Sequence, residues 1–200
     1  MSESTKPSKP KKIAKILIMG LDNSGKTSIL LSLQKSVNQK KINLLTYYSL
    51  KPTPGLNIIS IDKQDTRFNI WELGGQQQYR DEYLQDLEKY IQETSKFIYV
   101  IDVQDIDRYV EALQYFEDIF KHFNEQDRKK IQLSIFLHKF DPGLDEEPNF
   151  SYKTVSTRLT DKISSMIPSD VNYNIFKTTI YTIFEKKLLE SVSDEFFTIL

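Results

Sequence analysis

The chain has 200 residues, and its 27 basic and 28 acidic side chains give a formal net charge of −1, which does not favour bulk nucleic-acid binding. It contains no cysteine, which excludes disulfide bonds, thiol catalysis, thiolate metal ligands and palmitoylation. No apolar run approaches about 18 residues and no signal peptide is apparent, so we expect a cytoplasmic protein without a membrane span. A peripheral position at a membrane surface stays open.

The length fits one α/β domain with a sizeable core. Residues 1–12 are polar, with four lysines and two prolines, and predict a disordered, basic tail ahead of a domain that spans 13–200. A solvated tail is the favoured interpretation, with a role at a membrane surface as the alternative. Position 2 is serine, so N-myristoylation has no acceptor glycine.

The strongest signal is the segment Gly20–Thr27 (GLDNSGKT), which fits the phosphate-binding pattern GxxxxGK[ST]. An apolar run at 13–19 predicts a buried strand before it, and the run at 28–34 predicts a helix after it. In this context backbone N–H groups and a helix N-terminus bind phosphate, Lys26 can reach the β- and γ-phosphates, and the Thr27 hydroxyl can bind Mg²⁺. We therefore expect phosphates to lie against Leu21, Asp22, Asn23, Ser24, Gly25, Lys26, Thr27 and Ser28.

Apolar periodicity predicts alternating strands and helices along the rest of the chain. After a polar loop at 38–55, a hairpin is predicted from strands at 56–61 and 67–71. Further strands are predicted at 97–101, 131–137 and 173–176, and helices at 83–91, 110–123, 152–166 and 181–192. This alternation favours an α/β fold with a mostly parallel six-stranded sheet, helices on both faces and one antiparallel edge strand.

Four further motifs lie in chain order at the ends of predicted strands, and ligands bind outside the carboxyl ends of strands in open α/β sheets. They are PTPG at 52–55, ELGGQ at 72–76, HKFD at 138–141 and FKTTI at 176–180. Together with GLDNSGKT, this set resembles the small GTPase superfamily over about residues 13–190, with a P-loop small G-domain fold. The phosphate loop, PTPG and its spacing to WELGGQ resemble the Arf-like branch, whereas HKFD and FKTTI resemble the Rag branch.

The resemblance implies a guanine-nucleotide switch that binds GTP together with Mg²⁺ and hydrolyses the GTP slowly to GDP. Asp141 would accept hydrogen bonds from the guanine N1–H and 2-amino groups, and the alkyl stem of Lys139 would lie along the base. His138 replaces the usual asparagine and would tether the phosphate loop or pack. The last guanine loop would be formed by Thr178, Thr179 and Ile180.

The switch and metal residues are also implied by the resemblance. Thr53 and Gly75 would sense the γ-phosphate through their backbone N–H groups, so that its loss releases both segments. Gln76 is the catalytic candidate, which would orient the attacking water. Glu72 stands where most GTPases have aspartate, and it would contact Mg²⁺ through water with altered geometry because it is one methylene longer. The expected metal residues are Thr27, Thr53 and Glu72.

The sequence shows no evident internal arginine finger, so GTP hydrolysis is expected to be slow until a partner supplies a positive charge that stabilises the transition state. The implied partners are effector, exchange-factor and activating proteins, with a roadblock- or longin-type protein as a further candidate. Direct membrane anchoring is doubtful, because the tail lacks both an acceptor glycine and apolar periodicity. A nucleotide-binding scaffold with little turnover and an ATP-dependent P-loop kinase are the alternatives.

Overall fold

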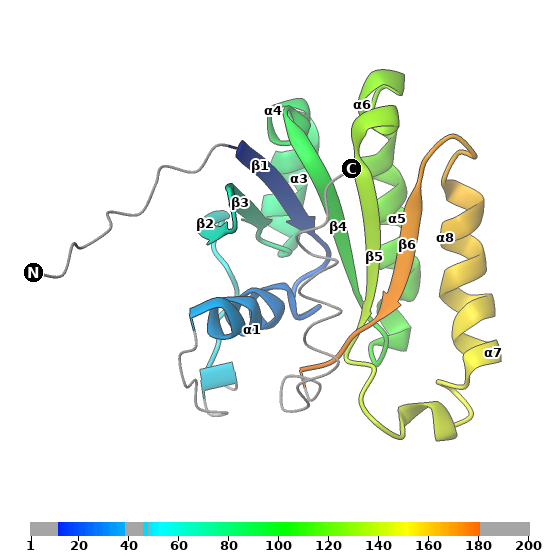
Figure 1. Cartoon of the computed structure of the whole chain (residues 1–200). Helices are drawn as coiled ribbons and strands as arrows, with labels where there is room; N and C mark the ends of the chain where they lie inside the picture. The colour runs from blue at the N-terminus through cyan, green and yellow to red at the C-terminus, as the bar shows by residue number, and fades with distance from the viewer. Residues whose placement is uncertain (1–11, 39–45, 48, 181–200) are drawn as a thin grey trace, which may run out of the picture.

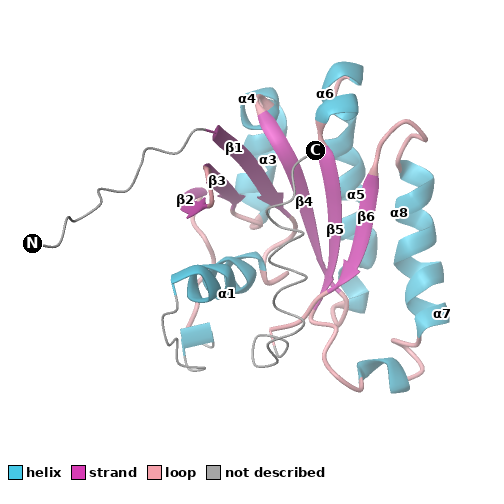
Figure 2. Cartoon of the chain, in the orientation of Figure 1, coloured by secondary structure: helices cyan, strands magenta, loops and turns pink. Residues whose placement is uncertain are grey.

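The computed structural model describes residues 12–38, 46–47 and 49–180, which form a sheet with helices on both faces (Figures 1 and 2). The strands are β1 (Lys12–Met19), β2 (Leu56–Lys63), β3 (Thr66–Leu73), β4 (Thr94–Asp102), β5 (Gln132–His138) and β6 (Tyr173–Lys177). The six-stranded order is β2-β3-β1-β4-β5-β6, and every neighbouring pair is parallel except β2 and β3. The predicted sheet with its antiparallel edge strand is confirmed, and Lys12 already lies in β1.

The helices are α1 (Lys26–Asn38), α3 (Gln77–Gln85), α4 (Glu88–Ile91), α5 (Tyr109–Lys121), α6 (Glu125–Lys130), α7 (Tyr152–Val155) and α8 (Asp161–Met166). The helix predicted at 83–91 is two pieces that begin earlier, at Gln77. A π-helical turn at Ser156–Thr160 connects α7 to α8 within the stretch predicted as one helix. The short, strongly polar α6 was not predicted, and the helix predicted at 181–192 lies outside the described residues.

Two apolar cores lie on opposite faces of the sheet. In β1, Leu17 and Met19 face the core that packs against α3, α5 and α8, whereas Ile16 and Ile18 face the core under α1. Successive strand side chains point to opposite faces, so a strand buried on both sides carries apolar residues at consecutive positions. This packing fixes the carboxyl ends of β1, β3, β5 and β6, where the GLDNSGKT, ELGGQ, HKFD and FKTTI segments lie. Within the described ranges, no helix is both long and apolar enough to cross a membrane.

Candidate functional site

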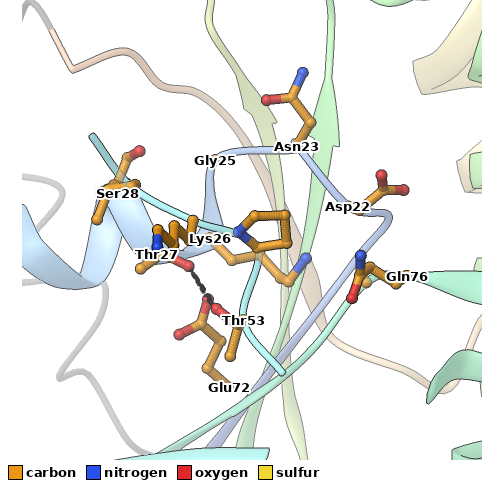
Figure 3. Close-up of a pocket in the computed structure, with 13 residues that line it drawn as sticks. Asp22, Asn23, Gly25, Lys26, Thr27, Ser28, Thr53, Glu72 and Gln76 are labelled. Atoms are coloured by element: carbon orange, nitrogen blue, oxygen red, sulfur yellow. Dashed lines mark hydrogen bonds between the residues drawn. The ribbon is translucent and has the colours of Figure 1, made fainter. Parts of the chain in front are cut away.

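The phosphate-loop segment, the PTPG segment and the ELGGQ segment surround one cavity of about 170 Å³ (Figure 3). Ten predicted site residues line it: Asp22, Asn23, Gly25, Lys26, Thr27, Ser28, Thr53, Glu72, Gly75 and Gln76. Leu50, Lys51 and Pro52 also line it and were not predicted. Of the other expected phosphate contacts, Leu21 and Ser24 are buried and line a smaller hollow on the α5 side of the loop.

Lys26 is the buried cation of this cavity. Its Nζ donates to the carbonyl oxygens of Gly20 at 2.9 Å and Leu21 at 2.7 Å. Burial lowers the pKa of Lys26 to about 8, an effect that the charges of Glu72 and Asp22 partly offset. The ammonium group is therefore held by the loop that the pattern assigns to phosphate binding, and a nearby anion favours its charged form.

The three predicted metal residues converge on one point of the cavity wall (Figure 3). The hydroxyl oxygens of Thr27 and Thr53 lie 2.9 Å apart, and both hydroxyls donate to Oε1 of Glu72, that of Thr53 at 3.2 Å. Glu72 is fully buried, and its Oε2 accepts a hydrogen bond from Asn57 Nδ2 at 3.0 Å. Sequence reasoning missed Asn57, whose signal was a single amide within the apolar strand at 56–61.

Oxygen donors of this kind suit Mg²⁺, which is commonly held by one or two carboxylates together with substrate phosphates. In the described part of the chain, no group of three or more His, Cys, Asp or Glu side chains could hold a metal ion. One carboxylate and two hydroxyls therefore fit a cation that the protein shares with phosphate oxygens. Thr27, Thr53 and Glu72 are the residues that would hold it.

The ELGGQ segment approaches the phosphate loop through its backbone. The Gly75 carbonyl accepts from the Asp22 N–H at 3.0 Å, and a Cβ on Gly75 would lie 2.2 Å from that nitrogen. Only glycine permits this approach. Gln76 follows directly as the N-cap of α3, with extended backbone angles, and its side chain lines the cavity. A buried glycine contact thus places the predicted catalytic side chain.

Asp22 also belongs to an ion-pair network that sequence reasoning missed. Arg108 donates to Asp22 Oδ1 at 2.6 Å and to Glu111 Oε2 at 2.9 Å, and Glu111 also accepts from the buried Arg80 of α3. The network connects the phosphate loop to α5 and α3. Both arginines are engaged by carboxylates.

His138 lies beneath the phosphate loop and does not line the cavity. Its ring is buried, Nδ1 lies 2.9 Å from the Thr178 hydroxyl, and a Cβ on Gly25 would lie 2.2 Å from its Cδ2. Burial, and to a lesser degree the charge of Lys139, lowers the pKa of His138 to about 3, so the ring is neutral at physiological pH. Of the two predicted roles, the structure therefore shows packing, against Gly25.

The other HKFD side chains are held at the ends of β4 and β5, beside the phosphate loop. Asp141 accepts from the Thr179 hydroxyl and, at 3.0 Å, from Gln104 Nε2, which also donates to the Lys139 carbonyl at 2.8 Å. Lys139 Nζ donates to Asp102 Oδ2 at 2.6 Å. Sequence reasoning missed Asp102 and Gln104, whose only signal was their position at the end of a predicted strand. Ile180 is the last described residue of the FKTTI segment.

Three comparisons relate the chain to known proteins. The model of the ADP-ribosylation factor (Arf) family matches residues 2–189. ADP-ribosylation factor 1 of Brassica rapa subsp. pekinensis is 35% identical over 133 residues, which are 66% of this chain and 64% of that protein. The match thus spans just under two thirds of the relative's length. The structure of the Arl6 BBS3 small GTPase from Trypanosoma brucei with bound nucleotide analogue GppNp has a TM-score of 0.60 and 19% identity, covering 92% of this chain and 99% of that one.

The fold and its glycine-rich loop define a P-loop protein of the small-GTPase architecture. The chain belongs to the ADP-ribosylation factor family.

Proposed function

We propose that this protein is a guanine-nucleotide switch that binds GTP together with Mg²⁺ and hydrolyses the GTP slowly to GDP. The observation that carries the proposal is the convergence of the phosphate loop, Thr53, Glu72 and Gln76 on one cavity. Family membership supports it, and so does the position of Asp141 and Lys139 at the neighbouring strand ends.

Asp141 would choose the base. Its two oxygens accept from Thr179 and Gln104, and each carboxylate oxygen keeps a lone pair for a further donor. The N1–H and 2-amino groups of guanine supply such a donor pair, whereas adenine has none at this edge. The ion pair between Lys139 and Asp102 would hold the lysine stem beside the base, and Thr178, Thr179 and Ile180 would complete this side of the site.

Lys26 and backbone N–H groups of Leu21–Ser28, other than that of Asp22, which donates to Gly75, would bind the β- and γ-phosphates. Gln76 would orient the attacking water. Mg²⁺, held by Thr27, Thr53 and Glu72, would neutralise charge that develops on the phosphate oxygens. Thr53 and Gly75 would sense the γ-phosphate through their N–H groups. Its loss would release both segments and change the surface that effectors recognise.

Because Arg80 and Arg108 are paired with carboxylates, we expect intrinsic hydrolysis on the order of 10⁻⁴–10⁻³ s⁻¹, as in a GTPase without its activator. An activating protein would then supply charge stabilisation, and an exchange factor would reload the site. A roadblock- or longin-type protein is a further proposed partner. The proposed location is the cytoplasm, with peripheral membrane contact left to such partners.

Replacement of Gln76 is expected to slow single-turnover GTP hydrolysis by at least about tenfold, because an aliphatic side chain cannot orient water. We would compare phosphate release by wild type, Gln76→Leu and Gln78→Leu. The last is a matched control, because Gln78 is exposed two residues along the same glutamine run. Equal rates in wild type and Gln76→Leu would remove Gln76 from the mechanism.

The second candidate function is a scaffold that binds nucleotide with little turnover. The observation behind it is Glu72, whose carboxylate occupies the space beside both metal-binding hydroxyls. Long single-turnover assays would separate the two functions: no phosphate release with tightly bound GTP would favour the scaffold.

A further inference from the structure

The oxygens of Thr27, Thr53 and Glu72 lie close enough together to bind the same cation. The two hydroxyl oxygens are 2.9 Å apart, Oε1 of Glu72 is 3.2 Å from that of Thr53, and it also accepts a hydrogen bond from Thr27. Ligands at right angles on Mg²⁺, with bonds of about 2.1 Å, lie about 3 Å apart. Two of the three separations therefore match those of neighbouring ligands in an octahedral site, and the third pair, Thr27 and Glu72, is in closer contact.

The length of the Glu72 side chain explains this spacing. Glutamate extends one carbon–carbon bond, about 1.5 Å, farther than the aspartate expected from the resemblance. In this chain the extra reach brings Oε1 into contact with the two hydroxyls. A carboxylate that acted through water would need a water molecule between itself and the cation, whereas Oε1 of Glu72 directly contacts the two hydroxyls that would bind the cation.

Asn57 fixes the carboxylate from its other side. Its amide donates to Oε2 at 3.0 Å across the β2–β3 pair, in which Asn57 and Glu72 are register partners. The carboxylate is fully buried, and the ammonium of Lys26 donates elsewhere, to Gly20 and Leu21. A buried anion is costly unless it is hydrogen-bonded and paired with positive charge, and metal coordination is one means of pairing it.

We propose that Glu72 binds Mg²⁺ directly through Oε1, as a third protein ligand beside Thr27 and Thr53, and that Asn57 is its positioning residue. The inference rests on the proposed function, because the remaining ligands would be nucleotide phosphate oxygens. This direct contact differs from the expectation, drawn from the sequence, that Glu72 contacts Mg²⁺ through a water molecule.

The number of water molecules on the metal tests this proposal. With Mn²⁺ and a non-hydrolysable GTP analogue, two threonine oxygens, two phosphate oxygens and Glu72 leave one of six positions for water, whereas contact through water leaves two. Broadening of the Mn²⁺ electron paramagnetic resonance lines in ¹⁷O-enriched water counts these positions. We expect one water in wild type and two in Glu72→Asp; two in wild type would overturn the proposal whether or not the variant folds.

The role of Asn57 has its own measurement. Asn57→Ala should weaken Mn²⁺ affinity by about 10- to 100-fold, the usual cost of losing a group that orients a metal ligand. Asn69→Ala is the matched control, since Asn69 of β3 accepts a hydrogen bond from Ser60 and touches no metal residue in the bonds described. Equal affinities in the two variants would contradict a positioning role for Asn57.

Binding of the analogue itself separates this inference from the proposed function. If wild type fails to bind a fluorescent guanine nucleotide, the proposed function fails and takes the inference with it. If wild type binds the nucleotide and holds two waters on Mn²⁺, only the direct contact of Glu72 is wrong.

Discussion

Asp141→Asn is expected to lower the affinity for GDP by about 10⁴-fold, the discrimination reached when a site built on hydrogen bonds meets the wrong partner. The carboxylate oxygens of Asp141 accept from Thr179 and Gln104 and keep lone pairs for the base. An amide would turn one of these acceptors into a donor, which would face the donors of guanine or of the two neighbours. At about 1.4 kcal/mol per tenfold change, this loss of affinity is about 5–6 kcal/mol, the order expected when two hydrogen bonds to a charged group are lost.

The same substitution should raise affinity for xanthosine diphosphate, because xanthine carries a carbonyl where guanine carries its amino group. Titration with fluorescent guanine and xanthine nucleotides measures both changes. Asp145→Asn is the control, because Asp145 is exposed in the same loop and its replacement removes the same charge. Unchanged base preference in Asp141→Asn would show that Asp141 does not contact the base.

Gly25→Ala is expected to cost about 2–5 kcal/mol of stability and at least about 100-fold in nucleotide affinity, since both strain and overpacking apply. Gly25 has φ +94°, and a Cβ there would lie 2.2 Å from Cδ2 and 2.6 Å from Nε2 of the buried His138 ring. The His138 ring is hydrogen-bonded to the Thr178 hydroxyl, so the ring cannot move away from Gly25 without loss of that hydrogen bond. The loop would move instead, and its N–H groups would leave the phosphate positions.

Gly143 supplies a matched control for this substitution. It has φ +83°, and no atom lies within 4 Å of a Cβ placed there, so Gly143→Ala carries backbone strain alone. Thermal unfolding and GDP titration should show the smaller loss for Gly143→Ala, and the double variant Gly25→Ala, His138→Ala should regain part of the affinity. If Gly25→Ala and Gly143→Ala lost equal stability and equal GDP affinity, the clash with His138 would be ruled out as the cause.

Strand positions were predictable because burial on both faces gives β1, β4 and β5 continuous apolar runs, at 16–19, 97–101 and 135–137, a pattern with few competing interpretations. Helix boundaries were less predictable from the sequence. The helix α3 begins at Gln77 with exposed glutamines, so its first turn has no apolar period to detect, and α6 is polar throughout. The π-helical turn at Ser156–Thr160 keeps the apolar spacing of the stretch at 152–166, so the sequence carried no sign of it.

Some residues of the candidate site were likewise predictable from the sequence and others were not. Segments with a contiguous pattern, such as Gly20–Thr27, could be placed on the cavity because the pattern specifies a backbone shape. The contacts of Asn57, Gln104 and Arg108 could not be predicted, since each residue acts through one side chain that reaches a residue distant in the sequence. The register of β2 on β3 sets the contact between Asn57 and Glu72, and a pairing register is a property of the folded sheet.

The nucleotide that purifies with the protein tests the central proposal most directly. The protein would be purified in Mg²⁺, denatured to release bound ligand, and the ligand identified by chromatography and mass spectrometry. We expect GDP or GTP in near-equal molar ratio to protein, because Asp141, the phosphate loop and the metal residues would act together. Adenine nucleotide at that ratio, or none in a folded protein that also fails to bind added GDP, would contradict the proposal.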